Sequence, residues 1–457
     1  MEGLITLEEV ISWNQDRIAK EYRDHVNPGF VKMLGLLDFD KQFVRAEGVN
    51  LYDQNGREYL DFLGGYGALN LGHNHPRIIE TLQEIEARPK ILPSAINPFS
   101  AALAHNLSLL TPGGINRFFF GNSGAEAVEG ALKTARAATG RQALVYTDGG
   151  FHGKTFGALS VTGREKYRKP FGPLVPGTLS VPYGDLEALE GVLKANEVAA
   201  LIIEPIQGEG GVIVPPAGYL REACNLCHRY GALFILDEIQ TGFGRTGRLF
   251  AAEWDEMSPD IICLAKSLGG GYVPIGAFGC TDQVWDAAYG GLDKALLHTS
   301  TFGGNTTATA VALATIEVLL AENLAEQADE LGSYFLAELR NLAEAYPIIQ
   351  EVRGRGLLIG LEFTSSTSLF GRIGASLMRK VSEEYIGGLV AGEMLNKHAI
   401  LTAYTLNNPN VIRMEPPLVV TKAQIDQVLN SLEHLLKTNS GLGKLALSAV
   451  SSKLRRS

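Results

Sequence analysis

Runs of consecutive apolar residues recur along the first two thirds of the chain, separated by turn-forming residues. They lie at residues 117–120, 143–147, 200–205, 233–238 and 261–265. Continuous apolar runs of this length, as opposed to alternating ones, are typical of strands that are buried on both faces of a parallel sheet. We therefore predict a central sheet with both faces covered.

The covering layers are predicted by the segments between these runs, where apolar residues recur at helical spacing. Two examples are GAEAVEGALKTARAA, which starts at Gly124, and GYLREACNLCHRYG, which ends at the helix-terminating Gly231. Repetition of strand, helix and strand indicates a mostly parallel sheet flanked by helices. The predicted fold class is α/β, with this sheet in the larger of two domains.

A second, smaller α+β domain is predicted by a change of pattern from about Thr307. Long helical periodicity gives way there to the strand pattern EVRGRGLLIGLEF, and Thr421 with Gln424 offers a capping box for a last helix. We expect a helical arm at residues 1–45, the first part of the small domain at 46–95, the large domain at 96–330, the rest of the small domain at 331–438 and a flexible tail at 439–457.

Composition and charge exclude several classes of protein. The 457 residues carry a formal net charge of −10, which argues against a nucleic-acid partner because phosphate backbones attract basic surfaces. The N-terminus lacks the pattern of a signal peptide, and the long uncharged stretch at 299–316 is too polar to span a membrane. Only four cysteines are present, which fits a reducing compartment, so we expect a cytoplasmic protein.

One motif favours a different chemistry. GFGRTG, Gly242 to Gly247, matches the glycine pattern of a dinucleotide-binding loop and follows a predicted strand. The residues after it open with Arg248 and do not continue as an apolar helix with a ribose-binding acid at the proper distance. A nicotinamide-dependent oxidoreductase therefore stays a distant alternative.

Two further patterns could be taken for metal ligands. Cys224 and Cys227 form a C-x-x-C, but no second cysteine pair completes a zinc site, so we interpret them as small buried residues on one helix face. His73 and His75 alternate in the turn sequence GHNHP without a third ligand at metal-binding spacing. We expect turn residues there and no metal.

Three other places combine into one chemistry. Ser123 and Glu126 form an S-x-x-E capping box after a predicted strand, and a helix N-terminus with an adjacent glycine can bind phosphate, although an ordinary capped helix has the same pattern. Asp237 lies at the carboxyl end of a strand, where α/β sheets bind ligands, and could keep a ring nitrogen protonated. Lys266, in CLAKSLGGG, lies in an apolar stretch where desolvation would lower its pKa. Together these are the features that bind pyridoxal 5′-phosphate (PLP).

In these residues the chain resembles the class III aminotransferases, which are PLP enzymes of fold type I. The resemblance runs from about Val44 to about Leu436 through LGGYGALNLGH, NSGAEAVEGALK, FHGKT, EPIQGEGG, LDEIQTGFGRTG, LAKSLGGG, STFGGN and VIRMEPPL. It implies that Lys266 holds PLP as a Schiff base and moves the substrate proton, while Asp237 pairs with the ring nitrogen. The other cofactor-binding residues that it implies are Ser123, Gly124 and Ala125 at the phosphate, Phe151 and His152 at the ring, Glu204, Gln240 at the ring oxygen, and Ser300 and Thr301.

The resemblance also implies partners and a substrate class. Thr301, with Ser300, would reach the cofactor of a second subunit, so a homodimer or a higher homo-oligomer is expected. Arg413 would bind the carboxylate of an oxo acid, Glu209 would neutralise Arg413 when the bound amine lacks a carboxylate, and Tyr66 would lie near the amine.

The chain looks closest to the putrescine aminotransferases. We expect transfer of the terminal amino group of a diamine, putrescine or cadaverine, to 2-oxoglutarate. An ornithine, acetylornithine or 4-aminobutyrate aminotransferase is the alternative. A catalytically inactive protein of the same fold is disfavoured because Lys266, Asp237 and Gln240 are all present.

Overall fold

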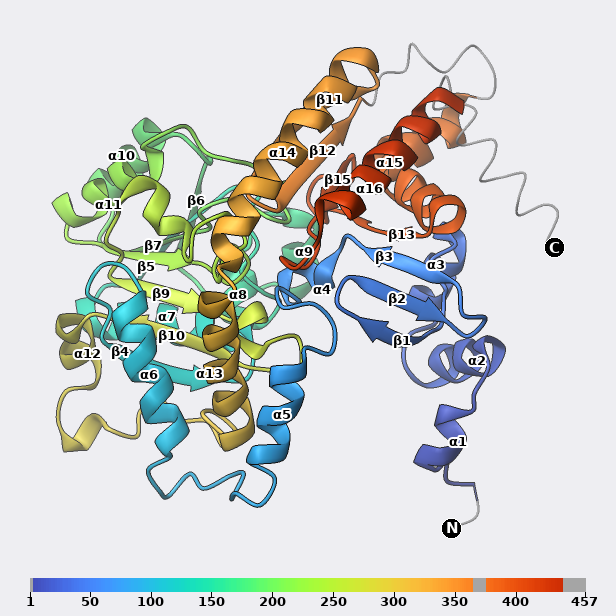
Figure 1. The fold of residues 1–457 in the computed structure, drawn as a ribbon. Helices are drawn as coiled ribbons and strands as arrows, with labels where there is room; N and C mark the ends of the chain where they lie inside the picture. Colours follow the sequence, from blue (N-terminus) through green and yellow to red (C-terminus); the bar gives the residue numbers. More distant parts are fainter. Residues whose placement is uncertain (1–2, 365–374, 439–457) are drawn as a thin grey trace.

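A seven-stranded sheet forms the centre of the larger part of the molecule (Figure 1). The computed structural model describes residues 3–364 and 375–438. The strand order is β4-β10-β9-β8-β7-β5-β6, in which neighbours from β9 to β6 are parallel and β10 is antiparallel to both β9 and β4. The strands are β4 (Arg117–Gly121), β5 (Ala143–Thr147), β6 (Thr178–Val181), β7 (Val198–Ile203), β8 (Leu233–Asp237), β9 (Ile261–Leu264) and β10 (Gly276–Cys280). Each of the five predicted apolar runs forms one of these strands, so the predicted mostly parallel sheet is confirmed.

Helices cover both faces of this sheet. Alternate residues of each strand pack into opposite cores, as in β5, where Leu144 lies with helix α7 and Val145 lies with α10 and α11. The helices of this part are α5 (Pro76–Glu84), α6 (Pro98–Leu110), α7 (Gly124–Thr139), α8 (Phe156–Ser160), α9 (Glu165–Arg168), α10 (Leu186–Ala195), α11 (Tyr219–Arg229), α12 (Asp282–Tyr289) and α13 (Thr306–Ala321), with short 3₁₀ turns η1 (Lys169–Phe171), η2 (Ala251–Asp255), η3 (Lys266–Gly269) and η4 (Leu292–Lys294).

Two four-stranded sheets form the smaller part, on the right of Figure 1. One has the order β1-β2-β3-β13 and the other the order β11-β12-β15-β14. Their strands are β1 (Phe43–Glu47), β2 (Asn50–Asp53), β3 (Glu58–Asp61), β11 (Ile349–Arg355), β12 (Leu358–Phe363), β13 (Ile400–Leu401), β14 (Ala403–Tyr404) and β15 (Val411–Met414). The remaining helices are α1 (Leu7–Ile11), α2 (Gln15–His25), α3 (Pro28–Leu37), α4 (Gly64–Gly67), α14 (Leu324–Ala345), α15 (Ala375–His398) and α16 (Lys422–Thr438).

The smaller part of the molecule is formed by two segments that are distant in the sequence, in agreement with the predicted order. Strand β13 pairs in parallel with β3 and so joins residues 400–401 to residues 60–61. The predicted boundary at 330–331 falls inside α14, which is one continuous helix, and the exact domain limits stay predictions. The predicted tail at 439–457 lies outside the described residues. Within the described ranges no single helix is long and apolar enough to cross a membrane, and the bent pair α13 and α14 meets that test by length and composition alone.

Helix α16 begins as predicted. The backbone N–H of Thr421 donates to the side-chain oxygen of Gln424 at 2.9 Å, and the N–H of Gln424 donates to Thr421 Oγ1 at 3.3 Å. These reciprocal bonds are the capping box, in which two unpaired donors of the first turn are satisfied. The prediction of a last helix from this motif is confirmed.

A close approach between β10 and the start of α7 depends on glycine. A Cβ atom on Gly276 would lie 2.0 Å from the carbonyl oxygen of Ser123, a backbone atom that cannot rotate away. Gly276→Ala should therefore destabilise the protein by roughly 1–3 kcal/mol, because the extra methyl group overpacks this contact. Thermal unfolding checks the effect.

Gly191 provides the matched control for this substitution. It lies inside α10, and no atom of the described part of the chain lies within 4 Å of an added Cβ, so Gly191→Ala should stabilise the helix by about 0.5–1 kcal/mol. Equal effects of the two substitutions would contradict the assignment of the close contact at Gly276.

Candidate active site

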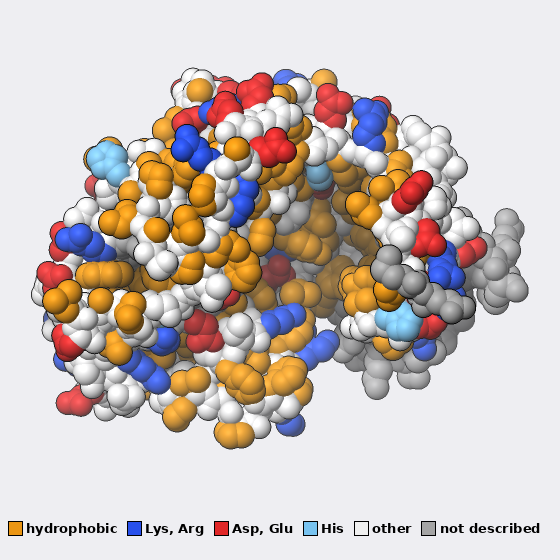
Figure 2. Space-filling model, turned by 90° about the horizontal axis from the view of Figure 1, so that it is seen from below, with side chains coloured by type: hydrophobic (Ala, Val, Ile, Leu, Met, Phe, Trp, Pro, Cys, Tyr) orange, Lys and Arg blue, Asp and Glu red, His pale blue; other side chains and the backbone are white. Residues whose placement is uncertain are grey.

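A cavity of about 480 Å³ lies at the carboxyl ends of β7, β8 and β9. The face of the molecule in Figure 2 is hollowed near its centre, with charged side chains at depth and hydrophobic side chains around them. Ligands of α/β proteins bind at this edge of the sheet. The predicted site residues that line the cavity are Ser123, Gly124, Ala125, Phe151, His152, Glu204, Glu209, Asp237, Gln240 and Lys266.

The N-terminus of α7 opens onto this cavity. Ser123 Oγ accepts a hydrogen bond from the N–H of Glu126 at 3.2 Å, which is the first half of the predicted capping box. The second half is wrong, because the Glu126 carboxylate accepts instead from the N–H of Asn122 at 2.6 Å. The first N–H groups of a 16-residue helix carry a partial positive charge, so Ser123, Gly124 and Ala125 can bind a phosphate group.

A buried pair of side chains, His152 and Asp237, forms part of the cavity wall. Asp237, at the end of β8, accepts a hydrogen bond from His152 Nδ1 at 2.7 Å, and both side chains are almost completely buried. Burial alone would lower the pKa of His152, but the bond and the charge of Asp237 outweigh burial and raise it. The hydrogen bond therefore fixes the position of the Asp237 side chain at the cavity wall.

Within residues 3–364 and 375–438, no atom forms a hydrogen bond with His152 Nε2, although this nitrogen is buried. Buried polar atoms are normally paired, and those left unpaired concentrate at functional sites. This unpaired atom next to an anionic wall is consistent with a site that holds a polar group.

Glu204 fixes the loop that carries Phe151. Its carboxylate accepts hydrogen bonds from the N–H of Phe151 at 2.8 Å and from the N–H of Gly208 at 3.0 Å. Burial raises the pKa of Glu204 to about 7, while the neighbouring His152 acts in the opposite direction. Glu204 therefore positions Phe151 at the cavity through backbone contacts.

Lys266 follows β9 directly and has a strained backbone. Its φ of 46° lies in the left-handed region, which non-glycine residues adopt at a cost of about 1–3 kcal/mol and mostly at functional sites. Burial lowers the pKa of Lys266, although the charge of Glu415 acts to raise it. A larger fraction of the amine is therefore neutral and able to bind a proton than for an exposed lysine.

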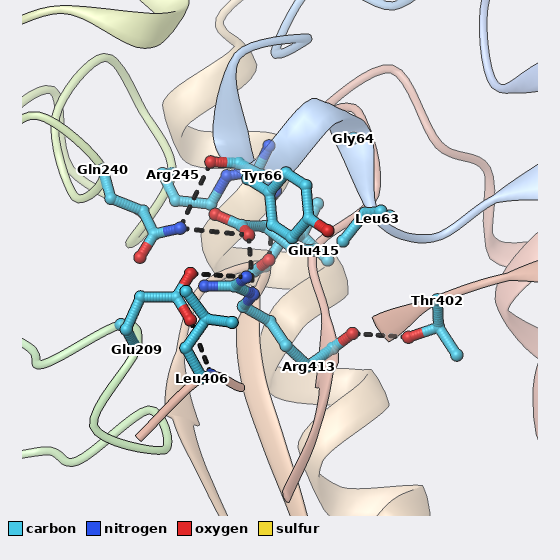
Figure 3. A network of polar contacts seen from close by, with 12 residues as sticks. Leu63, Gly64, Tyr66, Glu209, Gln240, Arg245, Thr402, Leu406, Arg413 and Glu415 are labelled. Carbon is cyan, nitrogen blue, oxygen red and sulfur yellow. Dashed lines mark hydrogen bonds and ion pairs between the residues drawn. The ribbon is translucent and has the colours of Figure 1, made fainter. Parts of the chain in front are cut away.

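Arg413 is fully buried next to Glu209, which lines the cavity, as Figure 3 shows. Its Nη2 atom lies 2.9 Å from Glu209 Oε1, and Glu209 Oε2 accepts from the N–H of Leu406 at 2.8 Å. Burial acts to raise the pKa of Glu209, but the charge of Arg413, the hydrogen bond from Leu406 and the charge of Lys266 together lower that pKa. The predicted pairing of Glu209 with Arg413 is present in the structure.

Tyr66 covers this ion pair from the side. Its ring centroid lies 5.0 Å from Arg413 Cζ, a cation–π contact, and its backbone oxygen accepts from Gln240 Nε2 at 3.2 Å. Helix α4, which contains Tyr66, is a left-handed turn, because residues 64–67 all have positive φ. Tyr66 is therefore held by contacts on several sides in a conformation that it would not adopt alone.

Glu415 is a residue of this site that the sequence interpretation missed. Its Oε2 atom lies 3.3 Å from Arg413 Nε and accepts from Gln240 Nε2 at 3.2 Å. Burial raises the pKa of Glu415 against the opposing charges of Arg413 and Arg245. Alternate residues of an extended chain share a face, so the pattern R-x-E, which begins in β15 and ends just after it, could have indicated this contact.

Ser300 and Thr301 do not line the cavity with Lys266. Both line a separate hollow of about 330 Å³, together with residues of the connection from 91 to 100. Ser300 Oγ accepts from Asn122 Nδ2 at 3.2 Å, next to the start of α7. Their contact with the cofactor of a second subunit stays a prediction.

Comparison with known proteins identifies the family. The model of the family described as aminotransferase class-III matches residues 38–436, which is most of the chain. The chain belongs to the class III aminotransferases. The predicted resemblance and the fold of PLP enzymes of type I are thereby confirmed.

Three solved structures are similar to this aminotransferase over most of its length. Ornithine aminotransferase from Toxoplasma gondii ME49 is 32% identical, covers 99% of this chain and 100% of its own, and has a TM-score of 0.81. Acetylornithine aminotransferase from Elizabethkingia anophelis is 32% identical, covers 93% and 99%, and has a TM-score of 0.75. A PLP-bound amine transaminase from an uncultivated Pseudomonas species is 30% identical, covers 86% and 94%, and has a TM-score of 0.76.

The cofactor of the family is PLP, and the cavity fits it. A helix N-terminus for the phosphate, a carboxylate for the ring nitrogen and a lysine lie on the walls of one cavity. PLP supplies an aldehyde that condenses with amines and a ring that stabilises negative charge on the adjacent carbon. Asp237 would hold the ring nitrogen, and Lys266 Nζ would bind and release the proton of the reacting carbon.

The dinucleotide-binding alternative is wrong for this aminotransferase. GFGRTG forms tight turns at Gly244 and Gly247 instead of opening a helix, and the 3₁₀ turn η2 follows. Arg245 of this motif is fully buried and donates to Pro416 O at 2.6 Å and Asn70 Oδ1 at 2.6 Å. The motif therefore connects the large sheet to the smaller part of the molecule.

The other metal-like patterns have structural roles. Cys224 and Cys227 are buried in the core beneath α11, as predicted. His75 caps α5, and His73 Nε2 lies 2.8 Å from Asp61 Oδ2. Among the residues that the structure describes, no three His, Cys, Asp or Glu side chains are grouped to hold a metal ion.

Replacement of Lys266 tests its role as proton carrier. Lys266→Ala should lower transamination by a factor on the order of 10⁴, because no other amine replaces its proton transfer. The unfolding temperature should change little. Lys194→Ala is the control, since Lys194 is an exposed lysine of α10 that pairs with Glu190 and lies outside the cavity. Activity retained in Lys266→Ala would refute this role.

Proposed function

We propose that this class III aminotransferase moves the terminal amino group of a diamine, such as putrescine or cadaverine, to 2-oxoglutarate. The products are an aminoaldehyde and glutamate. The observation that carries the proposal is the ion pair of Arg413 with Glu209, in which an acid of the cavity wall neutralises the guanidinium buried behind it. A neutralised arginine is compatible with a substrate that has no carboxylate at this end.

The same ion pair supports a dicarboxylate as acceptor. Arg413 presents a planar, permanently charged group that can bind a carboxylate through two parallel hydrogen bonds. Glu209 lines the cavity and holds Arg413 through one contact, so movement of one side chain would expose the guanidinium to 2-oxoglutarate. We propose that the two substrates use the site in turn, with Glu209 paired for the amine and displaced for the oxo acid.

Ornithine, acetylornithine or 4-aminobutyrate is the second candidate for the donor. This alternative is favoured by the similarity of the chain to ornithine and acetylornithine aminotransferases at 32% identity. The two candidates differ in whether the donor carries a carboxylate at the end remote from the reacting amine. We also propose that the protein acts as a homodimer in which Thr301 reaches the partner's cofactor.

Initial rates with a set of donors test the proposed substrate. With 2-oxoglutarate as acceptor, putrescine and cadaverine should give a higher kcat/KM than ornithine, acetylornithine and 4-aminobutyrate, because Glu209 cancels the charge that would bind a donor carboxylate. No turnover of either diamine, together with good turnover of ornithine, would refute the diamine proposal and leave the aminotransferase assignment intact.

Removal of the Glu209 charge tests the switch. Glu209→Gln should lower kcat/KM for diamines by about tenfold, because the second ammonium group of the diamine then faces an Arg413 that has lost one of its two carboxylate partners. The kcat/KM for donors that carry a carboxylate should fall less than this, or should rise. Glu187→Gln, an exposed acid of α10, is the control and should change neither. Equal losses for both donor classes would contradict the switch.

A further inference from the structure

Arg413 has two carboxylate partners, and Glu209 is only one of them. Glu415 Oε2 lies 3.3 Å from Nε, whereas Glu209 Oε1 lies 2.9 Å from Nη2. The two acids therefore contact different sides of the guanidinium, as Figure 3 shows. Arg413 and Glu415 are both completely buried, so water does not weaken their attraction.

The two acids differ in how firmly they are held. A Cβ atom on Gly67 would lie 2.4 Å from Glu415 Oε1, and one on Gly64 would lie 2.3 Å from the Glu415 carbonyl oxygen. Gln240 Nε2 also donates to Oε2 at 3.2 Å. Glu415 is thus packed against the left-handed turn of α4 and has no exposed surface.

Glu209, in contrast, lines the cavity and keeps part of its side chain exposed. It can leave Arg413 by moving into the cavity or towards solvent. When a substrate carboxylate replaces Glu209, Glu415 stays beside the guanidinium. The substrate carboxylate then takes the place of Glu209 and lies next to the carboxyl group of Glu415.

We propose that Glu415 is a specificity-determining residue that keeps Arg413 paired when Glu209 moves, and so lowers the affinity of this end of the site for carboxylates. Diamines gain by comparison, because they bring no carboxylate to Arg413. This inference rests on the proposed function and adds a residue that favours diamines over donors that carry a carboxylate. Glu415 also occupies the Nε side of the guanidinium, which leaves the Nη1 and Nη2 side for the acceptor carboxylate.

Binding of glutarate to the PLP-loaded enzyme tests the role of Glu415 directly. Glutarate has both carboxylates of 2-oxoglutarate and lacks the reactive carbonyl, and its dissociation constant can be measured from the change in cofactor absorbance. Glu415→Gln should bind glutarate about tenfold more tightly than the wild type, because like charges repel across a short, water-poor distance. Glu415→Asp keeps the charge and should stay close to the wild type.

The effect should depend on Arg413. In an Arg413→Gln background, Glu415→Gln should not increase glutarate affinity, because the guanidinium through which Glu415 acts is missing. Unchanged or weaker binding of glutarate by Glu415→Gln would overturn the proposal, as would a gain that persists without Arg413. Glu415→Met, which removes the charge at similar volume, carries the same expectation if the Gln variant fails to fold.

The donor rates separate this proposal from the proposed function. The ratio of kcat/KM for ornithine to that for putrescine should rise about tenfold in Glu415→Gln relative to the wild type. Failure of the wild type to use any diamine would refute the diamine donor alone, since the glutarate comparison does not depend on the donor. An unchanged glutarate affinity would refute the role of Glu415 alone.

Discussion

Charged side chains that are withdrawn from water need partners, and this requirement organises the whole carboxyl edge of the large sheet. Asp237 pairs with His152, Glu204 accepts from two backbone N–H groups, and Arg413 lies between two acids. Each partner comes from a different part of the chain. Removal of any one of these partners would therefore destabilise the protein, because it would leave a buried polar group unpaired.

Lys266 is the exception to this pattern, and its chemistry explains why. No ion pair with an acid is found for it among the described residues, and burial lowers its pKa. A lysine that must act as a base gains from being held without a direct counter-ion, since a paired ammonium would keep its proton. The left-handed backbone at Lys266 and at Tyr66 adds strain at one residue of the cofactor cavity and at one that covers Arg413.

The substrate end is built on a different principle, because it must accept two unlike molecules. Arg413 keeps a permanent charge, and the acids around it decide how much of that charge a ligand meets. Glu209 lines the cavity and can move away from Arg413, whereas Glu415 is packed against the turn that contains Gly64 and Gly67. The charge of Arg413 that a ligand meets therefore changes only through movement of Glu209. Selectivity in such a site depends on how much the binding free energy of a ligand differs between the state in which the guanidinium is paired with Glu209 and the state in which it is not.

The sequence by itself determined the layers and the chemistry of the cofactor site. Continuous apolar runs identified the strands of the large sheet, since strands buried on both faces need apolar residues at every position. Ser123, Asp237 and Lys266 could be grouped because the carboxyl ends of parallel strands meet at one edge. Family motifs added Glu209 and Arg413, whose pairing has no local pattern.

The tertiary structure decided what depends on contacts between distant segments. The role of Glu415 required the approach of the turn at 64–67 and of Gln240, which lie far from it along the chain. The predicted capping box of α7 was wrong in one of its two hydrogen bonds for a similar reason. The Glu126 carboxylate accepts from the N–H of Asn122 and not from that of Ser123, and the sequence does not distinguish these two donors. Sequence patterns report which side chains are buried and on which face, whereas the partner of a buried charge is set by packing between elements.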